Sequence, residues 1–232
     1  MKDLLQGLVQ AIGLIFRLDP ALFEVIWFSL YVSGVALTFS ILVGIPLGSI
    51  LGLKRFFGRR LVMALLYTGM GFPPVVIGLF VYLMLSRSGP VGGLGWLFTP
   101  RAIIVAQTII AFPLVAGFTM AAVMGVNPNL RQQLFSLGAT DWQATLATLA
   151  EARIGVIVAI IAGFGSIISE VGAVILVGGN IEGKTRTLTT AIVLETRKGN
   201  FDLAMALGII LLFISFLINL AMIRLQGREF TQ

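Results

Sequence analysis

The side chains that could carry out chemistry in this chain are few. Its 232 residues include no cysteine and no histidine, which excludes disulfides, thiolate nucleophiles, most zinc sites and histidine acid–base catalysis. Ser166 and Ser169 lie in a long apolar run, but no Lys or Asp lies within any such run to activate a serine hydroxyl. The sequence also lacks a Gly-x-x-x-x-Gly-Lys-Ser/Thr phosphate loop. We therefore predict that the chain is not itself an enzyme.

Glu170 is the one acidic residue within a long apolar run, where a carboxylate is costly enough to suggest a function. A carboxylate repels any anion that approaches it, so a role in binding an anion is excluded. We therefore expect Glu170 to pair with an arginine or a backbone donor and to hold its helix in place or form part of a gate. The alternative is a partly hydrated residue at a helix interface.

A basic, hydroxyl-rich segment follows Glu170 in the sequence. Its polar residues are Lys184, Thr185, Arg186, Thr187, Thr189 and Thr190. Arg and Thr donors suit a tetrahedral oxyanion, and positive charge at the mouth of a pathway raises the local anion concentration. The alternative is a solvated loop or a surface for a partner protein. Residues 187–199 are predicted to form a short helix that ends at Arg197, Lys198 and Gly199.

The strongly apolar composition of the chain predicts that membrane-spanning segments position these residues. Hydrophobic residues make up 58% of the chain and charged residues 11%, and the mean hydropathy is +1.02. A typical soluble domain carries about 25% charged residues, so the solvent that tolerates this chain is lipid. Five apolar runs are long enough to cross a bilayer: 25–53, 61–85, 101–125, 154–177 and 203–223.

Proline and glycine interrupt several of these runs. Pro46 lies in the first run and Pro113 in the third, where each predicts an interruption or a kink. Pro73 and Pro74 lie in the middle of the second run, beside Gly69 and Gly71. These residues predict a kinked or broken helix. Broken helices line pathways, because their freed backbone groups must face water or protein.

The termini and loops predict a topology. Residues 1–20 are expected to form an amphipathic helix on the bilayer surface, without the basic start or cleavage site of a signal peptide, and residues 21–232 a single transmembrane domain. Loop 54–60 contains four positive charges and marks the cytoplasmic side. Over the whole chain Lys and Arg divide evenly between the two sides, so the orientation rests on this cluster. Alternation then places the N-terminus outside, loop 178–202 outside and the C-terminus in the cytoplasm.

The predicted cytoplasmic loop 126–153 carries its own helix signals. Asn127 fits the N-cap of a short helix over 128–137, and Gly138 ends that helix as a C-cap glycine does. Thr140 fits the N-cap of a second helix that starts at Asp141 and Trp142. A folded cytoplasmic loop indicates docking onto another protein. The alternative is an ordinary helical connection, with Trp142 as an interfacial anchor.

Several segments resemble a known family. Leu137-Gly138-Ala139-Thr140-Asp141-Trp142 resembles half of the cytoplasmic signature of ABC importer permeases. The other half departs from it, with Gln132-Gln133-Leu134 in place of Glu-Ala-Ala and Ala150-Glu151 in place of Leu-Pro. Phe72-Pro73-Pro74, 169–173 and 177–188 resemble the molybdate/tungstate branch, with the tungstate permeases as the closest subgroup. Together the matches cover most of residues 25–225.

This resemblance implies an all-α, molybdate-permease-like ABC importer type I fold with about five transmembrane helices, in a prokaryotic inner membrane. Two copies would form the pathway, two ATP-binding subunits would bind ATP and Mg, and an extracytoplasmic binding protein would deliver tungstate or molybdate. This chain would hold no cofactor or metal and bind no nucleic acid. Coupling to the ATPase would fall to Leu137, Gly138, Ala139, Thr140, Asp141 and Trp142. The pathway or gate would contain Phe72, Pro73, Pro74, Ser169, Glu170, Asn180, Thr185, Arg186 and Thr187.

Other functions stay open on the residues alone. The same machine could carry another anion or an amino acid, because nothing in the pathway residues specifies the cargo. A self-sufficient secondary transporter or channel would need internal repeats and ion-coupling carboxylates in several spans, whereas the sequence offers Glu170 and no clear repeat. An ATP-binding partner separates the permease from a transporter, channel or membrane enzyme that acts alone.

Overall fold

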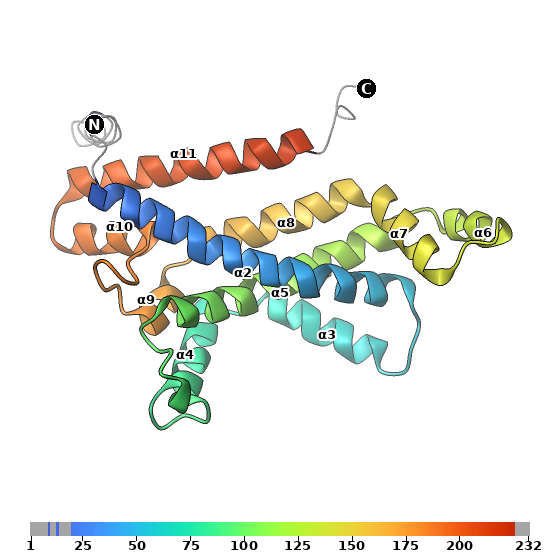
Figure 1. The fold of residues 1–232 in the computed structure, drawn as a ribbon, viewed down its shortest axis with the longest axis horizontal. Helices are drawn as coiled ribbons and strands as arrows, with labels where there is room; N and C mark the ends of the chain where they lie inside the picture. Colours follow the sequence, from blue (N-terminus) through green and yellow to red (C-terminus); the bar gives the residue numbers. More distant parts are fainter. Residues whose placement is uncertain (1–8, 10–12, 14–19, 226–232) are drawn as a thin grey trace. The chain divides into compact units, whose positions relative to one another are not determined.

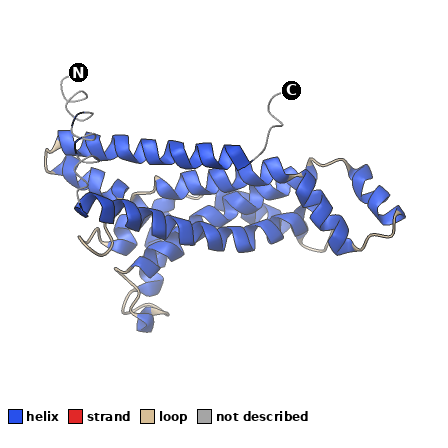
Figure 2. Ribbon diagram, turned by 45° about the horizontal axis from the view of Figure 1, so that its top comes forward, coloured by secondary structure: helices blue, strands red, loops and turns tan. Residues whose placement is uncertain are grey.

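The computed structural model describes residues 9, 13 and 20–225, and all regular elements in that part of the chain are helical (Figures 1 and 2). The α-helices are α2 Pro20–Leu53, α3 Arg59–Met70, α4 Pro74–Leu85, α5 Pro100–Met124, α6 Pro128–Ser136, α7 Asp141–Glu151, α8 Arg153–Ile168, α9 Gly172–Gly178, α10 Leu188–Arg197 and α11 Phe201–Leu225. A 3₁₀ turn, η1, covers Gly92–Leu94. Apart from residues 9, 13 and 20, the segment 1–20 that was predicted to form an amphipathic helix lies outside the described residues.

Three of these helices, α2, α5 and α11, are each long and apolar enough to cross a membrane. The pairs α3 with α4 and α7 with α8 also pass this test if each bent pair is one span, which gives up to five. The prediction of about five spans is confirmed at this level. The helix α2 continues through Pro46 and α5 through Pro113, so neither proline ends its helix.

The second predicted span is broken, as its prolines and glycines indicated. The helix α3 ends at Met70, and α4 begins at Pro74. Pro73 has φ −62° and ψ 123°, an extended conformation that the following proline favours. The chain therefore leaves the helical conformation at Gly71–Pro73 and resumes it with proline at the first position of α4, where no amide hydrogen is needed.

The prediction of one continuous span over 154–177 is wrong, because α8 ends at Ile168 and α9 begins at Gly172. Polar side chains compete with the helix at this break. Ser169 Oγ donates to the carbonyl oxygen of Gly165 at 2.8 Å, and Thr189 Oγ1 donates to the carbonyl oxygen of Glu170 at 2.9 Å. These bonds satisfy carbonyl groups near the break without a continuous helix.

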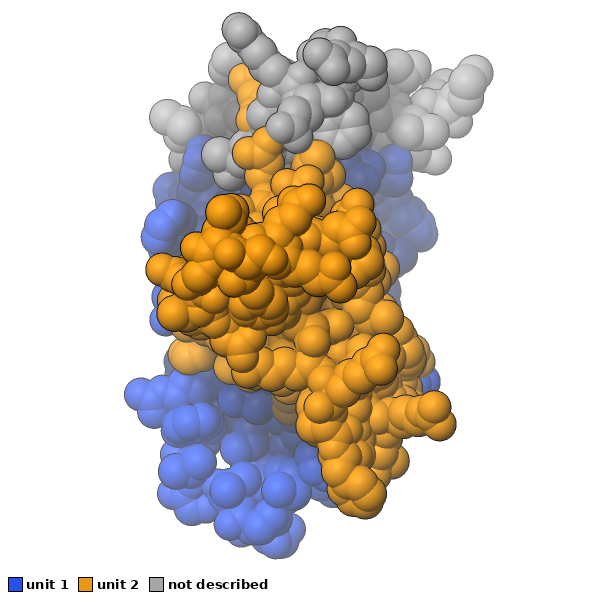
Figure 3. Space-filling view, turned by 90° about the vertical axis from the view of Figure 1, so that its right-hand side faces the viewer, with its two compact units in different colours: residues 1–36, 73–107, 165–220 blue, residues 37–72, 108–164, 221–232 orange. Residues whose placement is uncertain are grey.

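The chain divides into two compact units (Figure 3). Unit 1 contains residues 1–36, 73–107 and 165–220, and unit 2 contains residues 37–72, 108–164 and 221–232. The helices α2, α5, α8 and α11 contribute residues to both. The break Ser169–Val171 and the basic, hydroxyl-rich segment belong to unit 1, and the cytoplasmic loop predicted over 126–153 belongs to unit 2.

Unit 2 depends on close contact between α2 and α5. Gly44, Gly48 and Gly52 recur every fourth residue and face α5, so they lie on one side of α2. A Cβ atom at Gly48 would collide with the backbone carbonyl oxygen of Ala116. Small residues at this spacing let membrane helices approach closely. Leu51, Leu66, Ala116 and Met120 form the buried cluster beside this contact.

Unit 1 has an apolar cluster that joins the start of α2 to α10 and α11. Its buried members are Leu22, Leu188, Ala191, Ala206, Leu207 and Ile210. Ser29 Oγ accepts a 2.8 Å hydrogen bond from the amide of Leu188, the first residue of α10. The helices α4 and α9 also touch closely, since a Cβ atom at Gly78 would lie 2.5 Å from Ala173 Cα.

A buried carboxylate closes the turn between α10 and α11. Glu195 Oε1 accepts from Lys198 Nζ at 2.8 Å, and Oε2 accepts from Asn200 Nδ2 at 2.8 Å. The Asn200 side chain and then Lys198 hold the pKa of Glu195 below its ordinary value of 4.5. Asn200 in turn accepts from the amide of Ala204 in the first turn of α11, so the carboxylate fixes the start of that helix.

We expect Glu195→Gln to destabilise the protein by about 1 kcal/mol at neutral pH, because the variant loses the hydrogen bonds to the ionised carboxylate. The loss is no larger because Lys198 is half exposed, and water weakens its attraction to the carboxylate. A lowered folded-state pKa stabilises the fold above pH 4.5, and this stabilisation is lost as the pH falls through the folded pKa. Thermal unfolding of wild type and variant in detergent at several pH values measures how much Glu195 stabilises the fold at each pH. The difference between wild type and variant should shrink in acid. A difference that stays constant with pH would show that the charge contributes nothing.

Candidate functional site

The loop between α5 and α8 folds into the α6–α7 hairpin, residues 127–151, and the predicted caps are confirmed. The Asn127 side chain accepts from the amide of Asn129 at 2.9 Å and starts α6. Thr140 and Gln143 form a capping box at the start of α7, in which each side chain accepts from the other residue's amide. Both helices are therefore held by their own local sequence.

The turn between α6 and α7 is a Schellman motif. Gly138 has φ +84°, its amide donates to the carbonyl of Phe135, and the Ala139 amide donates to the carbonyl of Leu134, both at 3.0 Å. A residue with a Cβ atom is strained in this left-handed conformation, so glycine is the natural choice here. The motif satisfies the last carbonyls of α6 and fixes the direction in which α7 leaves.

The tip of the hairpin is apolar and exposed. Leu137 is 84% exposed and Trp142 is 69% exposed, and Phe135 is also exposed. Behind the tip, Arg131 Nη2 donates to Asp141 Oδ1 at 3.1 Å, which ties α6 to α7. Exposed apolar side chains on a rigid support are typical of an interaction surface. The predicted coupling residues 137–142 therefore come together at this tip.

In unit 1, Glu170 caps the short helix α9. Its Oε1 accepts from the amide of Ala173 at 2.9 Å, which confirms the predicted backbone donor. The negative charge also lies near the positive end of the α9 dipole. The Glu170 carboxylate therefore stabilises the start of α9, directly after the break between α8 and α9. Ser169 is exposed beside it, with its hydroxyl bonded to its own helix.

The break at Ser169–Val171 lies next to the first turn of α4. A Cβ atom at Gly172 would lie 2.5 Å from Val75 Cγ2, so Val75 and Gly172 touch. Pro74 thus lies near Glu170 within unit 1. Phe72 and Pro73 are exposed at the other predicted break. The pathway residues predicted in the two broken spans therefore lie at helix breaks, as expected for backbone that faces a cavity or protein.

The threonines between α9 and α10 point into the protein. Thr185 Oγ1 donates to the carbonyl of Gly178 at 2.6 Å and accepts from the amide of Ile181 at 2.9 Å, with Thr185 fully buried. Thr187 forms a capping box with Thr190 at the start of the predicted short helix, here α10. These hydroxyls hold the loop in shape. Sequence reasoning missed this role, because spacing does not reveal which way a loop hydroxyl points.

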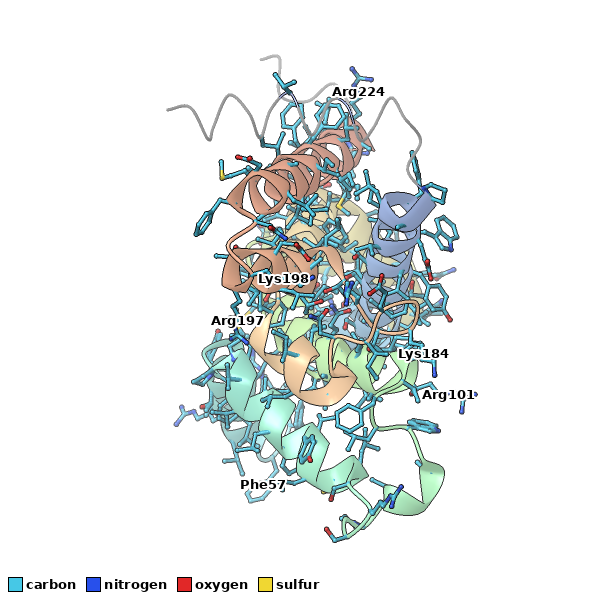
Figure 4. All side chains as sticks on the ribbon, turned by 90° about the vertical axis from the view of Figure 1, so that its left-hand side faces the viewer. Phe57, Arg101, Lys184, Arg197, Lys198 and Arg224 are labelled. Carbon is cyan, nitrogen blue, oxygen red and sulfur yellow. The ribbon has the colours of Figure 1, made fainter. Side chains whose placement is uncertain are left out.

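The cations of this segment differ from the threonines in exposure. Lys184 is exposed, and Figure 4 shows it on the same side of the molecule as Arg101. Arg186 is largely covered and pairs with Glu182 at 3.1 Å, while its Nε is buried without a partner among the described residues. Asn180 has φ +51°, and its side-chain Nδ2 contacts the carbonyl of Thr190 at 3.5 Å. In this segment the charge of Arg186 is thus partly neutralised by Glu182, while the charge of Lys184 is accessible to solvent.

Comparison with known proteins identifies the family of this chain. The family model "Binding-protein-dependent transport system inner membrane component" matches residues 44–228. A probable anion ABC transporter permease of Haloferax volcanii is 45% identical, covering 86% of this chain and 88% of its own length. The tungstate uptake permease TupB of Peptoclostridium acidaminophilum is 37% identical, covering 97% of this chain and 99% of its own length.

Solved structures agree on the fold. A methionine ABC transporter in an inward-facing conformation has a TM-score of 0.75 at 20% identity, with 90% of this chain and 96% of that chain covered. A bacterial alginate ABC transporter, in complex with a periplasmic protein, has a TM-score of 0.71 at 25% identity, with 86% and 76% covered. The helical architecture with two broken spans is therefore that of an ABC importer permease. The chain belongs to the inner-membrane-component family of binding-protein-dependent transport systems, in its molybdate/tungstate branch.

Proposed function

We propose that two copies of this chain form the membrane pathway of an ABC importer for tungstate or molybdate, driven by two ATP-binding subunits. The observation that carries this proposal is the α6–α7 hairpin. Its turn is fixed by a Schellman motif and a capping box, yet Leu137 and Trp142 are exposed at its tip. Such a rigid apolar tip suits a groove on an ATP-binding subunit. The cargo is inferred from the tungstate and molybdate relatives.

The hairpin suits the transmission of movement because its parts are linked by short contacts. Arg131 and Asp141 tie α6 to α7, and α7 meets α8 at a 70° bend after one intervening residue. When ATP closes the partner subunits, a push on the tip reaches α8 through this connection. ATP and Mg are bound by the partner, and this chain contributes the mechanical link rather than a cofactor site.

The proposed orientation places loop 54–60 and the α6–α7 hairpin in the cytoplasm and the N-terminus outside. It rests on the four cations of that loop. Lys184 and Arg186 then lie on the side of the extracytoplasmic binding protein, where they raise the local concentration of an oxyanion. Glu170 lies at the α8–α9 break and holds that break in shape. A conduit of this kind attracts its cargo without holding it tightly.

Uptake by cells that lack their own oxyanion permeases tests the proposal. We expect labelled tungstate to enter only when this chain, an ATP-binding subunit and a binding protein are expressed together. The tagged chain should purify with the ATP-binding subunit in equal amount. Unlabelled molybdate should compete, and sulfate should compete poorly. Strong competition by sulfate would assign a different oxyanion, whereas a chain that transports alone would contradict the permease role.

A further inference from the structure

A basic cavity lies in unit 2 where α2 and α5 end. Its volume is about 390 Å³, and none of its lining residues is acidic. Four cations line it: Lys54, Arg55, Arg59 and Arg131. Lys54 and Arg55 come from the loop after α2, Arg59 from the start of α3 and Arg131 from the first half of α6. Elements far apart in the sequence thus bring positive charge to one partly open cavity.

The cations are only partly neutralised by the protein. Asp141 lies 3.1 Å from Arg131 and 3.9 Å from Lys54, and among the described carboxylates it is the one within ion-pair distance of this set. Arg131 Nη1 is buried and has no hydrogen-bond partner in the described part of the chain. Arg59 is fixed differently, because its Nε donates to the carbonyl of Leu51 at 2.7 Å. An unpaired buried donor beside excess positive charge favours a bound anion.

The loop that supplies two of these cations also carries exposed aromatic side chains. Phe57, labelled in Figure 4, is fully exposed. Phe56 beside it is 44% exposed. Both lie between Lys54-Arg55 and Arg59-Arg60, next to the end of a helix long and apolar enough to cross a membrane. Aromatic rings flanked by cations are typical of the interface with anionic lipid. This loop therefore favours a lipid over a freely diffusing anion.

We propose that this cavity binds the phosphate of an anionic phospholipid headgroup, with Phe57 in the lipid interface. The cytoplasmic side of the site rests on the orientation given under the proposed function. Because Arg131 and Lys54 also contact Asp141, the first residue of α7, a bound phosphate shares its cations with the coupling hairpin. Lipid occupancy would thereby change how firmly α6 is tied to α7 in the hairpin that transmits movement from the ATP-binding subunits.

Native mass spectrometry of the purified permease–ATPase complex tests this site. The complex is exposed separately to phosphatidylglycerol, phosphatidylcholine and inorganic phosphate, and thermal unfolding is followed in parallel. We expect phosphatidylglycerol to be retained and to raise Tm, and the other two to do neither. The variant Arg55→Gln should weaken phosphatidylglycerol binding about fivefold, and Lys54→Gln by a similar factor.

Arg153→Gln is the matched control, because Arg153 is an exposed arginine of unit 2, in the predicted cytoplasmic loop 126–153, and does not line the cavity. It should leave phosphatidylglycerol binding within about twofold of wild type. Equal losses for Arg55→Gln and Arg153→Gln would show a diffuse field rather than a site and overturn the proposal. Equal retention of phosphatidylcholine, or saturation by inorganic phosphate, would also overturn it. Tungstate uptake is measured separately, so failure of the cargo assignment leaves this readout unaffected.

Discussion

Leu137→Asp is expected to abolish ATP-driven uptake while the permease still inserts and folds. Leu137 is 84% exposed, so its replacement removes little packing from this chain and should leave thermal unfolding unchanged. At an interface, by contrast, a central apolar anchor contributes about 2 kcal/mol or more, which corresponds to at least about thirtyfold in affinity. A buried, unpaired carboxylate adds a further cost. The measurements are labelled tungstate uptake and the amount of ATP-binding subunit that purifies with the tagged variant.

Leu137→Met is the matched control, since it keeps an apolar side chain of similar volume at the same position. It should transport nearly as well as wild type and keep its ATP-binding subunit. Full uptake by Leu137→Asp, with normal insertion, would show that the tip of the hairpin does not couple to the ATPase. Loss of thermal stability in Leu137→Asp would instead assign Leu137 a role within its own chain.

The hairpin is the part of the molecule that sequence reasoning predicted best, because its signals are local. Asn127 and Thr140 each satisfy an amide within three residues, and Gly138 adopts the one conformation that its helix end requires. None of these interactions depends on a distant element. The same reasoning explains why the helix α10 was predicted, since Arg197, Lys198 and Gly199 mark its own end and Gly199 has φ +81°.

The break between α8 and α9 could not be predicted in the same way. Residues 154–177 form a continuous apolar run, and hydropathy alone indicates one span. The break depends on Thr189, nineteen residues beyond Glu170, which donates to its carbonyl oxygen. It also depends on the close approach of Gly172 to Val75, on a helix ninety-seven residues earlier. Partners at such distances are set by the tertiary structure, so a pattern read along one segment does not contain them.

The same distinction applies to the candidate pathway. The sequence supplied a chemically sensible set of donors for an oxyanion, but burial turns Thr185 and Thr187 toward the backbone. What stays available to an anion on that segment is Lys184 and part of Arg186. In unit 2, cations predicted only as topology markers line a partly open cavity. Residue type therefore predicted the chemistry of these segments, while packing decides which groups are free to perform it.

The second large effect is expected from Gly48→Ala, which should destabilise the α2–α5 contact. The added methyl group would collide with the carbonyl oxygen of Ala116 and lie 3.0 Å from the backbone nitrogen of Met120. Backbone atoms cannot rotate away as a flexible side chain can, so the two helices must separate. Overpacking of this kind costs about 3 kcal/mol, against a gain of about 1 kcal/mol from replacing glycine by alanine in a helix. The net loss of about 2 kcal/mol should lower Tm in detergent and reduce accumulation in the membrane.

Two further glycines of α2 make the prediction a graded series. Gly34 has no atom within 4 Å of its Cβ position, so Gly34→Ala should be neutral or stabilising by up to about 1 kcal/mol. Gly52 is intermediate, because its nearest atom is Val123 Cγ1 at 3.1 Å, a side-chain atom. Thermal unfolding should therefore rank the variants Gly34→Ala, Gly52→Ala and Gly48→Ala from most to least stable. If Gly48→Ala unfolds at the same temperature as Gly34→Ala, the glycines of α2 are not what holds α5 in contact, and the cohesion of unit 2 must come from the apolar cluster around Leu51 and Met120 instead.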